Sequence, residues 1–287
     1  MTVTIDQSYI DQFSANIHSL LEQGTSKFKG IFMEENASGE KHFFERLGSF
    51  TASEVTGRLE TTDLQDPNHS RRMATVKLYQ ASTYMDNLDK IKLLIDPTSE
   101  YSMKLAKAHG RNYDDIVIDA LLNAAATGKD GSGSASLASA NKIAAGGTGM
   151  TVAKFNEGLK IMEADEVDID AGNVYIAVGA AGVEDLLGDS SNQFTSFDFQ
   201  ESKALATGNL PSFRGVKIIR TQRVPDNGSD KRAIMFTDES VKVAVAKSLE
   251  IKTAERPDLN FAQQISTYMA LGAVRMEENL VVEISYV

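Results

Sequence analysis

The apolar residues of this chain are most regularly spaced in the stretch DPTSEYSMKLAKAHGRNYDDIVIDALLNAAATG, residues 96–128. The positions that recur at helical spacing are Ile118, Leu121, Leu122 and Ala125. Asp96 and Pro97 favour a helix start, and Gly128 favours a stop. The pattern predicts a long helix. Because an interior glycine weakens a helix, Gly110 leaves two alternatives, one kinked helix or two stacked ones.

The segment before this helix is rich in threonine, valine and aromatic residues, which are typical of strands. Two β-prone runs, 43–59 and 73–84, flank the polar sequence ETTDLQDPNHSRR, in which Pro67 and Asn68 suit a turn. We therefore predict a long hairpin with this polar sequence at its tip. A lone hairpin is marginally stable in water, so this one is expected to lie on its own domain or on another chain.

The glycine-, serine- and alanine-rich stretch 128–149 is interpreted as a flexible loop or linker. Alternating helix and strand patterns follow, which predict a mixed α/β domain. The predicted helices are 150–168 with Thr151 as cap, 180–188 and 239–248, and the predicted strands are 173–179, one or two within 209–225, and 231–238. Near the end, 261–275 fits a strand or a helix, with Gly272 marking a bulge or turn, and 279–287 fits a final strand.

Composition and charge narrow the class of protein. The 287 residues include no cysteine, which excludes disulfides, thiolate zinc sites and cysteine nucleophiles. The formal net charge of −11 disfavours a dedicated nucleic-acid binder, because affinity for phosphate needs a cationic surface. No apolar run is long enough to span a bilayer, so we expect no membrane partner.

Candidate catalytic and metal-binding residues are sparse. The four histidines, His18, His42, His69 and His109, are scattered, and no pair has metal-ligand spacing. Asp114, Asp115 and Asp119 cluster on the predicted long helix and suit either acid–base chemistry, if buried together, or a solvated face. No nucleotide-binding or nucleophile motif is complete. We expect no enzyme activity, no cofactor and no metal.

Two charged clusters are candidates for contacts between subunits. We expect the predicted hairpin tip and a turn near the C-terminal strands to pair with a neighbouring chain, the alternative being solvated loops. The candidate residues are Arg58, Glu60, Arg71, Arg72, Glu255, Arg256 and Asp258.

The order of these parts resembles the major capsid protein of tailed bacteriophages, the Hong Kong 97-type shell fold. The resemblance rests on residues 96–128, on the two-stranded segment before them, and on the closing text from AIMFTDESVKVAVAKSLEIKTAERPD through GAVRMEENLVVEISYV. It implies an α+β fold with an N-terminal arm at 1–29 and an extended β-hairpin loop at 30–85. It also implies a peripheral domain at 86–130 and 246–287, with the long helix as its spine and the final strands beside it, and an α/β axial domain at 131–245.

By the same resemblance, the chain is expected to form hexamers and pentamers of an icosahedral shell around double-stranded DNA. Its expected partners are further copies, a scaffolding protein, the portal and decoration proteins. Its expected location is the virion, after synthesis in the bacterial host cytoplasm. Two alternatives stay open at this point: an encapsulin-like nanocompartment shell, and a soluble α/β enzyme with an unrecognised acidic site near Asp114–Asp119.

Overall fold

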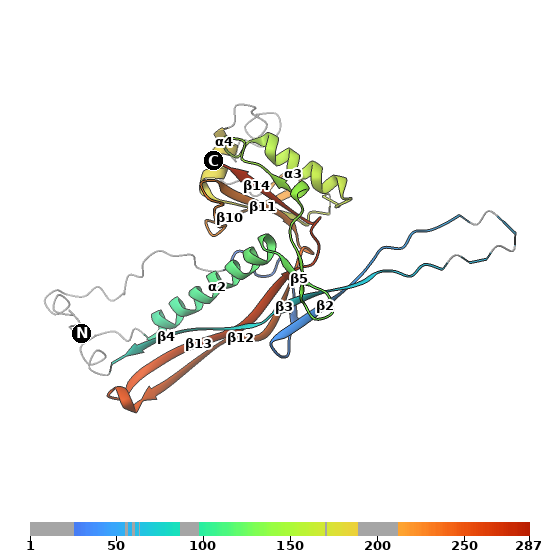
Figure 1. Cartoon of the computed structure of the whole chain (residues 1–287). Coiled ribbons are helices and arrows are strands. Elements are labelled where there is room, and N and C mark those ends of the chain that lie inside the picture. The colour runs from blue at the N-terminus through green and yellow to red at the C-terminus, as the bar shows by residue number, and fades with distance from the viewer. Residues whose placement is uncertain are drawn as a thin grey trace. The chain divides into compact units, whose positions relative to one another are not determined.

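The computed structural model describes residues 26–54, 57–58, 61–62, 64–86, 98–169, 171–188 and 212–287 (Figure 1). The helix start predicted at Asp96 and Pro97 lies outside these residues, as does most of the predicted arm. Contacts divide the chain into two units. One comprises Met1–Ser26, Leu78–Arg111 and Lys247–Met269, and the other Lys27–Lys77, Asn112–Ala246 and Ala270–Val287. We call them the smaller and the larger unit.

Three sheets organise the strands of the described chain. The first has the order β1-β12-β13-β4, the second β7-β14-β11-β8-β10-β9, and the third β2-β3-β5-β6. The strands are β1 (Met33–Asn36), β2 (Lys41–Leu47), β3 (His69–Thr75), β4 (Lys77–Met85), β5 (Ala125–Thr127), β6 (Gly133–Ala135), β7 (Lys142–Ile143), β8 (Val174–Val178), β9 (Ser212–Phe213), β10 (Val216–Arg220), β11 (Lys231–Thr237), β12 (Val241–Arg256), β13 (Ala262–Arg275) and β14 (Val281–Tyr286). The helices are α2 (Thr98–Leu122), α3 (Val152–Ala164) and α4 (Ala180–Gly188), with short 3₁₀ turns at Ser139–Asn141 and Pro257–Leu259.

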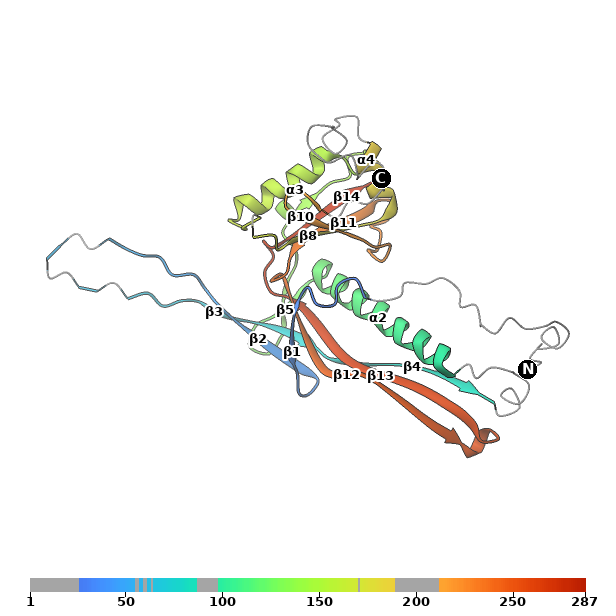
Figure 2. The same cartoon turned by 180° about the vertical axis from the view of Figure 1, so that it is seen from behind.

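The six-stranded sheet of the larger unit separates two apolar layers. Alternate residues of β8 and β11 face α3 and α4, which supply Phe155, Leu159 and Leu186 to one core. On β11, Phe236 stacks instead on Phe32, with ring centroids 5.3 Å apart. Figure 2 shows the sheet and its two helices from behind. The predicted helix and its cap are confirmed, since Thr151 accepts a hydrogen bond from the Lys154 amide, but α3 ends at Ala164 and not at residue 168.

The predicted long helix is confirmed as one helix, because α2 runs from Thr98 to Leu122 through Gly110. Ile118 and Leu121 are buried as expected. The helix ends five residues earlier than predicted, because Ala125–Thr127 leave it to form β5, which pairs with β3 and β6.

Several predicted elements were wrong, and strand pairing, mostly with residues distant in sequence, explains the differences. Residues 239–248 were expected to form a helix but belong to β12, whose residues 242–245 pair in parallel with β1. The glycine-rich stretch 128–149 is not a plain linker, since it contributes β6 and β7 to two sheets. Of the two alternatives for residues 261–275, the strand is confirmed, and Gly272 marks no turn, because β13 continues through it. A Cβ there would lie 2.3 Å from the Thr75 carbonyl oxygen.

The final strand also differs from its expected place. β14 was expected beside the long helix, whereas it pairs with β11 on one side and β7 on the other, inside the six-stranded sheet. Among the described residues, no helix is long and apolar enough to cross a membrane.

The smaller unit is held together by a chain of polar contacts across three of its segments. His109 on α2 lies 2.9 Å from the Thr267 hydroxyl on β13, and that hydroxyl donates to the Ala81 carbonyl of β4 at 3.0 Å. Because the hydroxyl hydrogen is used on Ala81, the ring nitrogen Nε2 of His109 is the donor to Thr267. Burial lowers the pKa of His109 below its ordinary 6.5, so the neutral ring is favoured.

Candidate assembly surfaces

The stretch between β2 and β3, residues 48–68, extends away from the rest of the larger unit (Figure 1). Most of its described residues are exposed, including Phe50 at 60% and Leu64 at 89%. The Gly48 amide donates to the Asn68 carbonyl, and the Thr51 amide donates to the Gln65 side chain at 2.9 Å, so its two limbs run side by side. The predicted strand 43–59 was too long, because β2 ends at Leu47. The predicted strand 73–84 is divided between β3 and β4, of which only β3 pairs with β2.

Arg71 and Arg72 are adjacent in the chain but have different environments, and neither lies at the tip of the extended stretch. Both were expected in the turn of the hairpin, but they belong to β3, where they pair across the ladder with Phe44 and Glu45. Arg71 forms an ion pair with Glu45 at 2.7 Å, and both side chains are well exposed. Arg71 therefore remains accessible to a partner, whereas its neighbour Arg72 is 4% exposed.

A buried charge network fixes the root of the loop. Arg72 donates to both carboxylate oxygens of Glu278 at 2.7 Å and to the Met276 carbonyl at 3.1 Å. Arg275, fully buried, lies 3.8 Å from the same carboxylate and donates to the carbonyls of Leu121 and Asn123 at the end of α2. We call Arg72, Arg275 and Glu278 the root network. It joins the loop strand, the end of β13 and the long helix within one unit.

The turn between β12 and β13 presents the second predicted charge cluster. Arg256 forms a two-point contact with Asp258, which raises the pKa of the arginine and lowers that of the carboxyl. Glu255 is exposed. Arg58 is exposed in the extended stretch, and Glu60 lies outside the described residues.

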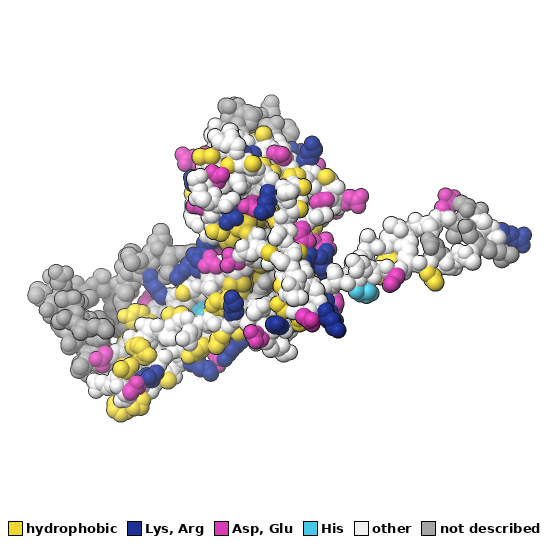
Figure 3. Space-filling view, viewed as in Figure 1, with side chains coloured by type: hydrophobic (Ala, Val, Ile, Leu, Met, Phe, Trp, Pro, Cys, Tyr) yellow, Lys and Arg dark blue, Asp and Glu magenta, His cyan; other side chains and the backbone are white. Residues whose placement is uncertain are grey.

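The same turn also carries exposed apolar side chains that the sequence reading passed over. Leu259 is 44% exposed and Phe261 57% exposed. Asn260 and Phe261 both have positive φ angles, 53° and 57°, which is uncommon for an aromatic residue. Figure 3 shows hydrophobic side chains gathered at this end of the β12–β13 hairpin. A strained turn with exposed apolar groups is typical of a contact surface.

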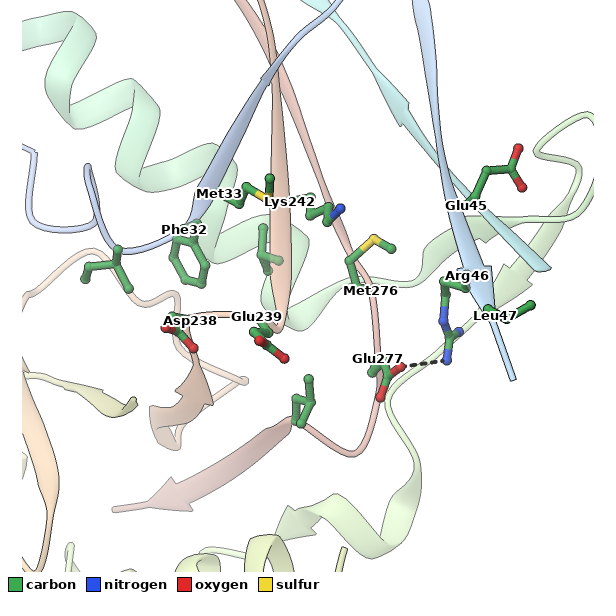
Figure 4. Close-up of a pocket in the computed structure, with 13 residues that line it drawn as sticks. Phe32, Met33, Glu45, Arg46, Leu47, Asp238, Glu239, Lys242, Met276 and Glu277 are labelled. Carbon is green, nitrogen blue, oxygen red and sulfur yellow. Dashed lines mark ion pairs between the residues drawn. The ribbon is translucent and has the colours of Figure 1, made fainter. Parts of the chain in front are cut away.

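A cavity of about 740 Å³ opens beside the root of the loop, within the larger unit (Figure 4). We call it the β2 pocket. Its wall is formed by β1, β2, the start of β12, and the turns that precede β12 and β14. The lining residues include the apolar Phe32, Met33, Leu47, Val241, Met276 and Leu280 and the charged Glu45, Arg46, Asp238, Glu239, Lys242 and Glu277. Sequence reasoning did not find this pocket, since its residues come from four separate parts of the chain.

The acidic cluster on the long helix is dispersed by the fold. Asp114 is fully buried, and its carboxylate accepts backbone N–H groups of Lys27 and Phe28 at 3.1–3.3 Å. Asp115 is ion-paired with Arg223, and Asp119 is exposed. The solvated-face alternative therefore does not hold for Asp114, whose carboxylate binds the start of the described chain. Backbone N–H groups already occupy its carboxylate, so the arrangement does not favour acid–base chemistry.

Within the described part of the chain, no group of three or more His, Cys, Asp or Glu residues is arranged to hold a metal ion. The described histidines are separate from one another. His42 lies near Glu35, His69 begins β3, and His109 is buried on α2.

Comparison with known proteins identifies relatives of this architecture. The family model described as phage capsid protein matches residues 5–287. The capsid structure of cyanophage P-SCSP1u is similar at a TM-score of 0.76 and 15% identity, covering 100% of this chain and 95% of that one. Mycobacterium phage Che8 gives 0.74 and 14%, covering 96% of each chain. The cyanophage Pam1 capsid asymmetric unit gives 0.74 and 15%, covering 100% and 98%. No curated protein sequence matches.

Proposed function

Since this chain belongs to the phage capsid protein family, we propose that it is the major shell subunit and assembles into hexamers and pentamers that close around double-stranded DNA. The predicted Hong Kong 97-like fold is confirmed by the capsid structures that cover nearly the whole chain. The family is a structural one, which accords with the expectation of a non-enzyme. The two alternatives, a nanocompartment shell and an acidic-site enzyme, are not favoured.

The observation that carries this proposal is the exposed stretch 48–68. Its limbs bury little surface within their own unit, and it bears the exposed apolar residues Phe50 and Leu64. A ribbon of this kind gains stability when it lies on a second surface. We propose that it lies on a neighbouring subunit, and that many such modest contacts, repeated around a closed shell, provide its strength.

The finer assignments follow from the same proposal. We propose an arm at 1–29, an extended loop at 30–85, a peripheral domain at 86–130 with 246–280, and an axial domain at 131–245 that also includes the last strand β14 instead of leaving it in the peripheral domain. A scaffolding protein, the portal and decoration proteins are proposed partners, and the subunit is proposed to be made in the host cytoplasm before it enters the virion. The net charge of −11 suits a container that encloses DNA without gripping it.

Electron microscopy of the purified protein tests the proposal. We expect closed shells, formed alone or with the proposed scaffolding protein, whereas stacked rings or a monomer that assembles under neither condition would refute it. The inter-subunit residues are tested by Arg58→Glu. Arg58 is exposed and has no ion pair within the described residues, so the variant is expected to fold normally and to yield fewer shells. Lys160→Glu, an equal charge change at an exposed position of α3, serves as the control. Equal shell yields from both variants would remove Arg58 from the interface.

A further inference from the structure

The β2 pocket combines an apolar floor with an unbalanced negative charge. Val241 and Phe32 are buried in its floor, while Met33 and Leu47 at its edges are 60% and 57% exposed. Figure 4 shows Phe32, Met33 and Leu47 around one opening, with Asp238 and Glu239 close together on the turn before β12. Exposed apolar groups around a hollow are typical of a binding surface, and methionine adapts readily to different partners.

The basic side chains that line the pocket have ion-pair partners, whereas two of its acidic side chains have none within the described structure. Arg46 is ion-paired with Glu277 at 3.5 Å, and Lys242 is ion-paired with Glu35 at 2.9 Å. Both lining cations are therefore already engaged. Among the described residues, Asp238 and Glu239 form no ion pair, and Glu239 is exposed. The pocket thus has two acidic groups to offer to a cationic occupant.

No long segment of this chain outside the described residues carries a net positive charge, and residues 87–97 contain two acidic residues and two lysines. Residues 1–25 contain three acidic residues and no lysine or arginine, and residues 189–211 contain three acidic residues and one lysine. The stretch 48–68 contains four acidic residues and one arginine. Placing any of these three acidic segments against Asp238 and Glu239 would bring like charges together, which is unfavourable.

We propose that the β2 pocket docks a short, basic, amphipathic segment of a different protein. Its lysines or arginines face Asp238 and Glu239, and its apolar side chains lie on Met33, Leu47 and the floor of the pocket. This inference rests on the proposed function in one respect: the partner is a protein that the subunit meets during or after shell assembly. The position beside the root of the loop means that an occupant also touches β2, the strand that leads into the extended stretch.

The direct test is binding of a labelled helical peptide of lysine, leucine and alanine to the soluble subunit, followed by fluorescence anisotropy. We expect saturable binding that weakens with added salt. In the double variant Asp238→Lys, Glu239→Lys we expect the Kd to rise at least about tenfold. If charge reversal impairs folding, the neutral double variant Asp238→Asn, Glu239→Gln tests the same charges with a smaller change. The variant Leu47→Ser tests the apolar contact separately.

The matched control is Glu163→Lys, Glu184→Lys, which makes the same charge change at exposed positions of α3 and α4. Equal weakening in the control, or equal binding of a peptide with glutamate in place of lysine, would overturn the proposal. A photo-crosslinker at position 47 that joins two copies of this chain in assembled shells would also overturn it, because a second copy would then occupy the pocket. Binding is measured on the soluble subunit and shells by microscopy, so failure of either hypothesis is seen independently.

Discussion

Replacing Glu278 by glutamine removes the carboxylate shared by two buried arginines. In the described structure Arg72 contacts both oxygens of Glu278, and Arg275 lies 3.8 Å from one of them. The matched change is Glu45→Gln, which removes the acceptor of Arg71, the residue beside Arg72 on the same strand. The two substitutions are chemically identical and differ mainly in the burial of the arginine that they leave behind.

The side-chain exposures set the expected magnitudes. Arg72 and Arg275 are 5% and 0% exposed, and burial lowers the pKa of both guanidinium groups, which shows that their charge is held in an unfavourable environment. Breaking a buried pair from one side costs about 3–5 kcal/mol; since glutamine keeps one acceptor oxygen, we expect a loss of about 3 kcal/mol. The exposed Arg71–Glu45 pair contributes at most about 1 kcal/mol.

Urea unfolding of the unassembled subunit, followed by far-ultraviolet circular dichroism, measures both losses. With a denaturant slope of about 3 kcal/mol per molar, Glu278→Gln is expected to lower the midpoint by about 1 M. Glu45→Gln is expected to lower it much less. If the two variants unfold at the same urea concentration, the root network does not stabilise the fold in the way described. The result also decides which arginine suits an assembly test: Arg71 can be reversed in charge with the subunit intact, whereas reversal of Arg72 is expected to unfold it.

Three further outcomes are expected. Lys154 donates to the carbonyls of Ala145, Thr148, Gly149 and Ser285, and Lys154→Met removes this donor from each, although the first two keep backbone donors. Tm should therefore fall by about 5–10 °C in a thermal melt, and an unchanged Tm would contradict this. Because the pKa of His109 is lowered in the folded protein, the unfolded chain binds the extra proton first, and the free energy of unfolding should fall as pH drops below 6.5. In urea titrations His109→Asn should reduce this dependence of stability on pH, and an unchanged dependence would refute the assignment. Gly272→Ala places a Cβ 2.3 Å from the Thr75 carbonyl oxygen, and this clash should reduce the soluble yield. The neighbouring change Ala273→Gly adds no atom, so it cannot reduce the yield through a clash.

The sequence alone was sufficient to predict helices whose cap and apolar residues lie close together in the chain. The α3 helix shows this, because its cap Thr151 and its apolar stripe, including Phe155 and Leu159, lie within one short window and all behave as expected. The same holds for α2, where packing of Ile118 and Leu121 outweighs the cost of an interior Gly110.

Elements that depend on distant partners were predicted poorly. Residues 239–248 contain good helix formers, yet pairing of β12 with β1, about two hundred residues earlier, decides for a strand. Asp114 looked solvated because the amides that it accepts belong to residues 27 and 28. Arg72 looked like a surface charge because Glu278, its partner, lies 206 residues away. The β2 pocket was missed for the same reason, since no single window contains its wall.

The position of β14 has a consequence for how the protein is made. This strand is the last in the chain, yet it lies between β7 and β11 inside the six-stranded sheet, and Ile284 and Tyr286 are part of the core shared with α3 and α4. Until the ribosome has released residue 286, that core lacks an interior strand and β11 has an open edge. The larger unit therefore completes its folding only after nearly all of the present sequence has been translated. Any association that needs this completed core must therefore wait until residues 281–286 are available to join the sheet.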